Sequence, residues 1–178
     1  MNRILAAATG LLLLTTTAAC GSDDGGSTNE QRTLTVFAAA SLTDTFTEIG
    51  QEFESANPGV TVRFSFDGSS NLVAQLQQGA PADVFASADT TTMATATDDG
   101  LVDGSPTDFA TNVLQIVTPP DNPAGVESLA DLADPDVAVV LCAPQVPCGN
   151  ASVEVERLAG IDIAPVSEEQ SVTDVLNK

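Results

Sequence analysis

Three stretches of the sequence bring small residues to the point where an expected strand gives way to an expected helix. Ser41 follows "FAAA", Ser69 follows "FDG", and Gly149 follows "QVPC". Backbone N–H groups in the first turn of a helix have no partner inside the helix, and together with the helix dipole they favour an anion. The simpler alternative is helix capping, because Ser and Asn satisfy these N–H groups in most proteins.

The alanine triplet before Ser41 favours anion binding. Ala38, Ala39 and Ala40 remove side-chain bulk directly before a hydroxyl at a helix start, so a ligand has room to reach backbone N–H groups. An anion is the natural ligand for such a joint, because the N–H groups and the helix dipole both point at it.

The hydrophobic pattern places these joints in alternating strands and helices. Strands are predicted over 34–40, 60–66, 84–87, 112–120 and 136–142, with a further strand or turn over 161–166. Helices are predicted from Ser41, over 71–79, 90–98, 125–134 and 151–160, and from about residue 171. This alternation is typical of an α/β fold with parallel sheets, in which ligands bind at the carboxyl ends of strands.

Composition excludes several classes of function. The chain has 178 residues, a net charge of −20 and no His. The negative charge excludes nucleic-acid binding and makes an anionic membrane surface a poor partner for the fold. The lack of His excludes the Ser-His-Asp and Cys-His catalytic arrangements and most zinc sites.

Two carboxylates, Asp83 and Asp89, flank a predicted strand and could form an acid–base pair. We expect instead that Asp83 sets the turn before the strand and that Asp89 caps the helix after it.

The N-terminal residues have the features of an export signal. Arg3 precedes an apolar run over 4–14, so residues 1–19 are predicted to be a signal peptide. The stretch "TTTAAC" predicts cleavage before Cys20 and a lipid on its sulfur; the alternative is ordinary signal cleavage with an incidental cysteine. Residues 20–32 are rich in Gly, Ser and acids and predict a flexible tether. We therefore expect an extracytoplasmic, membrane-anchored protein.

Cys142 and Cys148 flank "APQVP" in a chain predicted to be exported. An oxidising compartment favours a disulfide between them, which would stabilise the fold by about 2–2.5 kcal/mol on the loop-entropy model. Two free thiols are the alternative, and a redox-active pair is disfavoured because the spacing is not C-x-x-C.

Three longer segments resemble a known family. "TVFAAASLTDTFTEIG", "FSFDGSSNLVAQLQQGAPADVFASAD" and "CAPQVPCGNAS" are similar to the corresponding segments of periplasmic molybdate-binding proteins, the receptors of molybdate ABC importers. The resemblance covers residues 34–178 in order and spacing. It implies the type II periplasmic binding protein fold, in which two α/β lobes with mixed, mostly parallel sheets are joined by a hinge. Lobe 1 would span 33–112 and lobe 2 would span 113–178.

The resemblance also implies a set of ligand-binding residues. Ser41 and Ser69 would donate from hydroxyl and backbone N–H, while Cys148 and Val172 would donate from backbone N–H alone. In many members a tyrosine hydroxyl completes the site, but this chain has no Tyr and ends at Lys178. We therefore expect a C-terminally truncated chain, with the second lobe and the return to the first incomplete and roughly 60–80 further residues needed.

The function implied is that of a substrate-binding lipoprotein. It would capture molybdate or tungstate between its lobes and deliver it to the membrane permease of an ABC importer, as a monomer attached to the membrane only by its lipid. No enzymatic activity, cofactor or free metal ion is expected. The alternatives are a receptor for another tetrahedral oxyanion such as sulfate, and a non-binding surface lipoprotein with the same fold. An extracellular serine hydrolase is disfavoured by the lack of His and of G-x-S-x-G.

Overall fold

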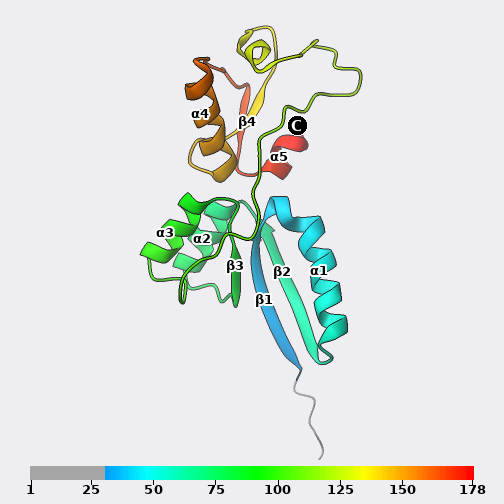
Figure 1. Ribbon diagram of the computed structural model, residues 1–178, viewed down its shortest axis with the longest axis vertical. Coiled ribbons are helices and arrows are strands. Elements are labelled where there is room, and N and C mark those ends of the chain that lie inside the picture. The colour runs from blue at the N-terminus through cyan, green and yellow to red at the C-terminus, as the bar shows by residue number, and fades with distance from the viewer. Residues whose placement is uncertain (1–30) are drawn as a thin grey trace, which may run out of the picture.

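The computed structural model describes residues 31–178 and contains two α/β units, one above the other in Figure 1. The predicted signal peptide and the lipidation site at Cys20 lie outside the described residues. Within 31–178, no helix is both long and apolar enough to cross a membrane. The prediction of an α/β fold with parallel sheets is confirmed for both units.

The first unit is a three-stranded parallel sheet with helices packed against it. Its strands lie in the order β2-β1-β3, and Val36 of the central strand pairs with both Phe64 and Val84. The elements are β1 (Arg32–Ala39), a 3₁₀ turn η1 (Ala40–Leu42), α1 (Thr43–Ala56), β2 (Val60–Asp67), α2 (Ser69–Gln77), β3 (Val84–Ala86) and α3 (Thr90–Asp98). All strands point the same way, so their carboxyl ends meet at one edge, and η1 and α2 begin there.

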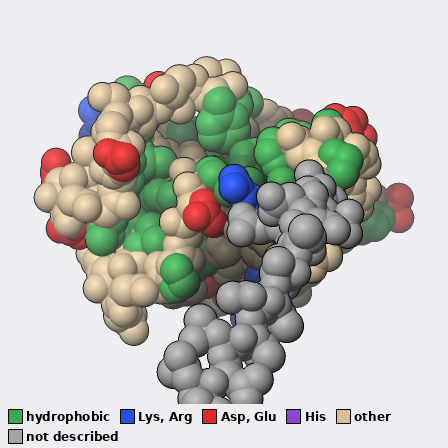
Figure 2. All heavy atoms as spheres, turned by 90° about the horizontal axis from the view of Figure 1, so that it is seen from below, with side chains coloured by type: hydrophobic (Ala, Val, Ile, Leu, Met, Phe, Trp, Pro, Cys, Tyr) green, Lys and Arg blue, Asp and Glu red, His purple; other side chains and the backbone are tan. Residues whose placement is uncertain are grey.

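The core of this unit lies between the sheet and its helices. Val36, Ala38 and Ala86 are buried at its centre, and the rings of Phe46 and Phe64 pack beside them. Burial of such side chains stabilises the unit at roughly 25 cal/mol per Å² of apolar surface. Figure 2, a view from below that faces this unit, shows apolar side chains in green across the hollowed part of the face.

The second unit is smaller and has a two-stranded parallel sheet. It consists of a 3₁₀ turn η2 (Leu129–Ala133), β4 (Val140–Cys142), α4 (Pro147–Ala159), β5 (Ser167–Glu169) and α5 (Val172–Leu176). Cys142 pairs with Glu169 at the carboxyl end of this sheet. Gly160 caps the C-terminus of α4, and its φ of 66° is the left-handed conformation that glycine adopts without steric cost.

The strand predicted over 112–120 is wrong. This segment belongs to the extended connection between the two units in Figure 1, and Val113 and Val117 are 74% and 68% exposed. A strand requires a neighbouring strand to accept and donate its backbone hydrogen bonds, and no strand within 31–178 pairs with this one. Strand-like side chains alone were therefore an insufficient signal.

Other predicted boundaries differ as well, and the largest differences lie in the second unit. The helix predicted over 125–134 is only the turn η2, because Asp134 precedes Pro135 and is held in extended geometry. The strand predicted over 136–142 shortens to β4, since β5 offers only three partner residues. The strand or turn predicted over 161–166 precedes β5, which begins at Ser167. Helix α4 begins earlier than predicted, with Pro147 in its favoured place in the first turn.

Candidate functional site

A small cavity of about 30 Å³ lies where the two α/β units meet. Holding one water molecule takes about 10–15 Å³ by this measure, so the cavity suits a ligand of a few atoms. Both units contribute to its lining: Ala39, Ala40, Ser41, Gly68, Ser69 and Ala88 from the first, and Pro147, Cys148, Gln170, Ser171 and Val172 from the second. The cavity thus brings together all four residues that the sequence analysis expects to bind a ligand.

Ser41 lies in the middle of the turn η1, which begins directly after the buried end of β1. The residue that caps this turn is Ala39, and the cap of α1 is Leu42, so Ser41 is the N-cap of neither element. The capping alternative therefore does not describe Ser41. Ala39 and Ala40 line the cavity, as expected from their lack of bulk, whereas Ala38 is buried in the core of the first unit and does not line it.

Ser69 is the first residue of α2 and is 1% exposed. Its Oγ accepts a hydrogen bond from the backbone N–H of Ala88 at 3.0 Å. A serine hydroxyl can accept and donate at once, so this bond leaves the Ser69 proton free to be donated to a ligand. The N-cap of α2 is Gly68, so Ser69 also lies inside the first helical turn.

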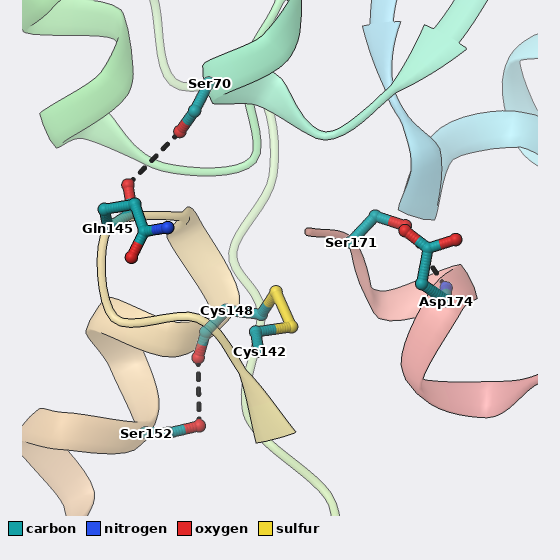
Figure 3. The surroundings of a disulfide bond; sticks show 7 residues. All are labelled: Ser70, Cys142, Gln145, Cys148, Ser152, Ser171 and Asp174. Atoms are coloured by element: carbon teal, nitrogen blue, oxygen red, sulfur yellow. Dashed lines mark hydrogen bonds between the residues drawn. A yellow bond between two sulfur atoms is a disulfide. The ribbon is translucent and has the colours of Figure 1, made fainter. Parts of the chain in front are cut away.

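Cys148 lies in the first turn of α4 and is bonded to Cys142 at the end of β4, the pairing that the sequence analysis expects (Figure 3). Gly149, directly after Cys148, packs closely against the loop between the two cysteines. A Cβ at Gly149 would lie 1.8 Å from the carbonyl oxygen of Ala143 in that loop. The Cys148 carbonyl accepts a hydrogen bond from Ser152 Oγ at 3.0 Å. The helix, the disulfide and the close contact at Gly149 together define the position of Cys148 beside the cavity.

Val172 is the first residue of α5, which contacts the turn that carries Ser41. The cap of α5 is Ser171, whose Oγ accepts from the Asp174 N–H at 3.2 Å and donates to the Asp174 carboxylate at 2.7 Å (Figure 3). Sequence reasoning missed Ser171 as a cavity residue. The spacing Ser171-x-x-Asp174 is a helix-start pattern that could have indicated it.

Comparisons with known proteins agree with the fold. A family model described as bacterial extracellular solute-binding protein matches residues 34–176. The chain belongs to this family. Among curated members, it is 56% identical over 147 residues to the molybdate-binding protein ModA of Mycobacterium tuberculosis strain H37Rv. The match covers 83% of this chain and 56% of that protein, so this solute-binding chain spans little more than half the length of its relative.

Two solved structures share the fold of this solute-binding chain. The Azotobacter vinelandii periplasmic molybdate-binding protein superposes with a TM-score of 0.58 at 22% identity, over 81% of this chain and 65% of that one. The sulfate-binding protein SubI from Mycobacterium tuberculosis H37Rv superposes with a TM-score of 0.59 at 20% identity, over 82% and 61%. At these identities the likeness defines the fold alone.

The electrostatic character of the cavity is neutral, because every residue that lines it has an uncharged side chain. The side chains of Arg157 and Lys178 form ion pairs with residues that do not line the cavity. Arg157 pairs with Glu154 at 2.6 Å, and Lys178 pairs with Glu169 at 3.2 Å. The hydrogen bond from Ser167, and then Lys178, lower the pKa of Glu169. The described part of the chain has no cluster of His, Cys, Asp or Glu suited to a metal ion. An anion in this cavity must therefore be held by neutral donors.

Asp83 and Asp89 both serve the architecture of the first unit. Asp89 caps α3 by accepting from the Thr92 N–H at 2.9 Å, which confirms its expected role. Asp83 exchanges two hydrogen bonds with Thr35 of β1: its carboxylate accepts from the Thr35 N–H at 2.7 Å and its own N–H donates to the Thr35 carbonyl at 2.8 Å. Neither carboxylate lines the cavity, so the acid–base alternative has no support there.

Proposed function

We propose that this solute-binding chain captures molybdate, or its analogue tungstate, between its two lobes. The observation that carries the proposal is the meeting of Ser41, Ser69, Cys148 and Val172 around one small cavity with neutral walls. Three sequence-distant helix starts and the 3₁₀ turn η1 converge on that cavity, and each contributes donors suited to an anion. The 56% identity to a protein named for molybdate binding supports the choice of ligand.

The binding chemistry follows from the donors. Ser41 and Ser69 would supply hydroxyls, and we expect the first-turn N–H groups of Cys148 and Val172 to direct their partial positive charge at the same space. A bare tetrahedral dianion can accept from all of them. Monohydrogen phosphate would bring an O–H that needs an acceptor, which backbone N–H groups cannot provide and which a serine hydroxyl provides only by accepting where it would otherwise donate; an unsatisfied buried O–H costs about 1–3 kcal/mol. Donor geometry therefore selects against protonated oxyanions.

The cellular role we propose has three parts. The chain acts outside the cytoplasmic membrane, attached through a lipid on Cys20, and it hands its ligand as a monomer to the permease of an ABC importer. Lobe 1 corresponds to residues 33–112 and lobe 2 to 113–178. The chain has no catalytic task, because capture and release of the anion break no covalent bond. The family match to extracellular solute-binding proteins supports this role.

Sulfate is the alternative ligand. Like molybdate it is a tetrahedral dianion without a proton at neutral pH, so the same donors can hold it, and only size separates the two. A non-binding surface lipoprotein is the other alternative, and it predicts no anion affinity at all.

Calorimetric titration of the purified protein with molybdate, tungstate, sulfate and phosphate tests the proposal. We expect saturable one-to-one binding of molybdate and tungstate and none of phosphate. Thermal unfolding with each anion is the companion measurement, since ligand at about 100 times its Kd stabilises the folded state by roughly 2.7 kcal/mol. Binding of sulfate alone would favour the alternative ligand, and no heat or Tm shift with any anion would refute the proposal.

A further inference from the structure

Gly68 of the first unit and Gln170 of the second approach each other closely beside the cavity. A Cβ at Gly68 would lie 2.4 Å from the carbonyl oxygen of Gln170 and 3.4 Å from its carbonyl carbon. The atom in the way belongs to the backbone, so it cannot rotate aside as a side chain would. Close by, Ser70 Oγ donates a hydrogen bond to the carbonyl of Gln145 at 3.3 Å, a second contact between the units (Figure 3).

The reason for a glycine at position 68 is space. Its φ of −56° and ψ of 133° are ordinary values that any residue adopts, so the backbone conformation does not require glycine. Gly68 is also the N-cap of α2, a position where Ser, Asn and Asp are at least as favourable. Neither conformation nor capping explains the glycine, and the Gln170 carbonyl does.

This contact is adjacent to the expected donors on both sides. Gly68 directly precedes Ser69 in the first unit, and Gln170 is two residues before Val172 in the second. The distance between the two donors therefore follows the distance between Gly68 and Gln170. We infer that Gly68 sets how closely the two lobes approach across the cavity, and thereby the size of the oxyanion that the cavity holds. The statement about oxyanion size rests on the proposed function; the statement about spacing does not.

The expected effect of a Cβ at position 68 follows from these distances. The Gln170 carbonyl would have to move from 2.4 Å to at least 3.0 Å, a shift of 0.6 Å or more. Hydrogen bonds have a working range of only about 2.7–3.2 Å for N–H···O, so an anion held by one lobe would lose contact with the other. A smaller anion should lose more binding affinity, because it reaches the donors of both lobes less well across the widened gap.

The experiment compares four proteins by calorimetry with molybdate and sulfate: wild type, Gly68→Ala, Gly68→Ser and Gln78→Ala. Gly68→Ala and Gly68→Ser add the same Cβ, but serine is the better helix cap, so together they separate bulk from capping. Gln78→Ala is the control, because Gln78 is exposed at the far end of α2 and does not line the cavity. We expect about tenfold or weaker molybdate binding in both Gly68 variants, a still larger loss for sulfate wherever wild type binds it, and wild-type affinity in Gln78→Ala.

Crystal structures of ligand-free wild type and Gly68→Ala give a readout that needs no anion. We expect the separation between Ser69 and Val172 to increase by at least 0.6 Å in the variant. Unchanged separation and unchanged affinity in both Gly68 variants would overturn the inference. If both Gly68 variants fail to fold while Gln78→Ala folds, the contact belongs to the folding core and is not an adjustable spacing, which also overturns the inference. A widened gap in a protein that binds no oxyanion would refute the proposed function and leave the spacing role intact.

Discussion

The Oγ atom of Ser69 accepts the backbone N–H of Ala88 at 3.0 Å, and this bond ties the start of α2 to the loop after β3. Ser69 therefore has a structural partner as well as a free proton. Ser41 differs, since it is exposed in the turn η1 and caps no element. The two serines face the same cavity, but their removal should have different consequences.

Ser41→Ala should weaken molybdate binding by about 10- to 150-fold, which corresponds to one charge-assisted hydrogen bond of roughly 1.5–3 kcal/mol. Stability should change little, because Ser41 is not a cap. Calorimetric titration gives the affinity and thermal unfolding gives the stability. Ser55→Ala, the same change on the exposed side of α1, is the matched control. Unchanged affinity in Ser41→Ala would remove Ser41 from the binding site.

Ser69→Ala should lower both affinity and stability. The lost donor weakens molybdate binding as in Ser41→Ala, and the Ala88 N–H loses its acceptor, which costs about 0.5–1.5 kcal/mol of folding free energy. Urea unfolding without ligand measures the second effect. A variant with full stability would show that water replaces the Ser69 hydroxyl as acceptor, contrary to the role assigned here.

The Cys142–Cys148 disulfide should stabilise the oxidised protein by about 2–2.5 kcal/mol, given the short loop with a sequence separation of 6. Non-reducing peptide mapping of protein isolated from outside the membrane should find the linked pair. A reductant should lower the denaturation midpoint of wild type but not of the Cys142→Ser/Cys148→Ser double variant. Two alkylatable thiols in the isolated protein would contradict the pairing.

Asp131 should make the free energy of unfolding depend on pH. Its carboxylate accepts from the Ser128 N–H at 2.7 Å, the Glu127 N–H at 2.9 Å and the Ser128 hydroxyl at 3.0 Å. The bond from Glu127, followed by those from Ser128, lowers the pKa of Asp131. A lowered pKa means that the stabilisation is complete above the unfolded value of about 3.9 and is lost as the pH falls through the folded value. The stability difference between wild type and Asp131→Asn should therefore be constant from about pH 5 to 7 and shrink below about pH 4.

Lipid attachment at Cys20 is expected from "TTTAAC" and the acidic tether that follows. Mass spectrometry of the membrane fraction should find a diacylglyceryl group on Cys20, and Cys20→Ser should release the protein from that fraction. A mature N-terminus at any other residue would contradict the anchor.

The sequence predicted those parts of the fold and site that depend on local pattern. The strand before Ser41 and the first two helices of the first unit could be predicted, because the spacing of their apolar residues identifies them and Pro or Gly residues mark the ends of the helices. The stretch over 112–120 could not, because strand formation depends on a partner that no local pattern reveals. The contact between Gly68 and Gln170 joins positions about a hundred residues apart, so only the assembled fold reveals it.

The neutral cavity inside a chain of net charge −20 separates the arrival of an anion from its retention. Arrival is opposed by the field of the whole surface, and salt screens that field within about 8–10 Å at physiological ionic strength. Retention depends on short-range hydrogen bonds inside the cavity, which salt screens only weakly. Raising the ionic strength would therefore hasten capture of a dianion and leave its rate of release nearly unchanged, the reverse of the behaviour of a site built on Lys and Arg.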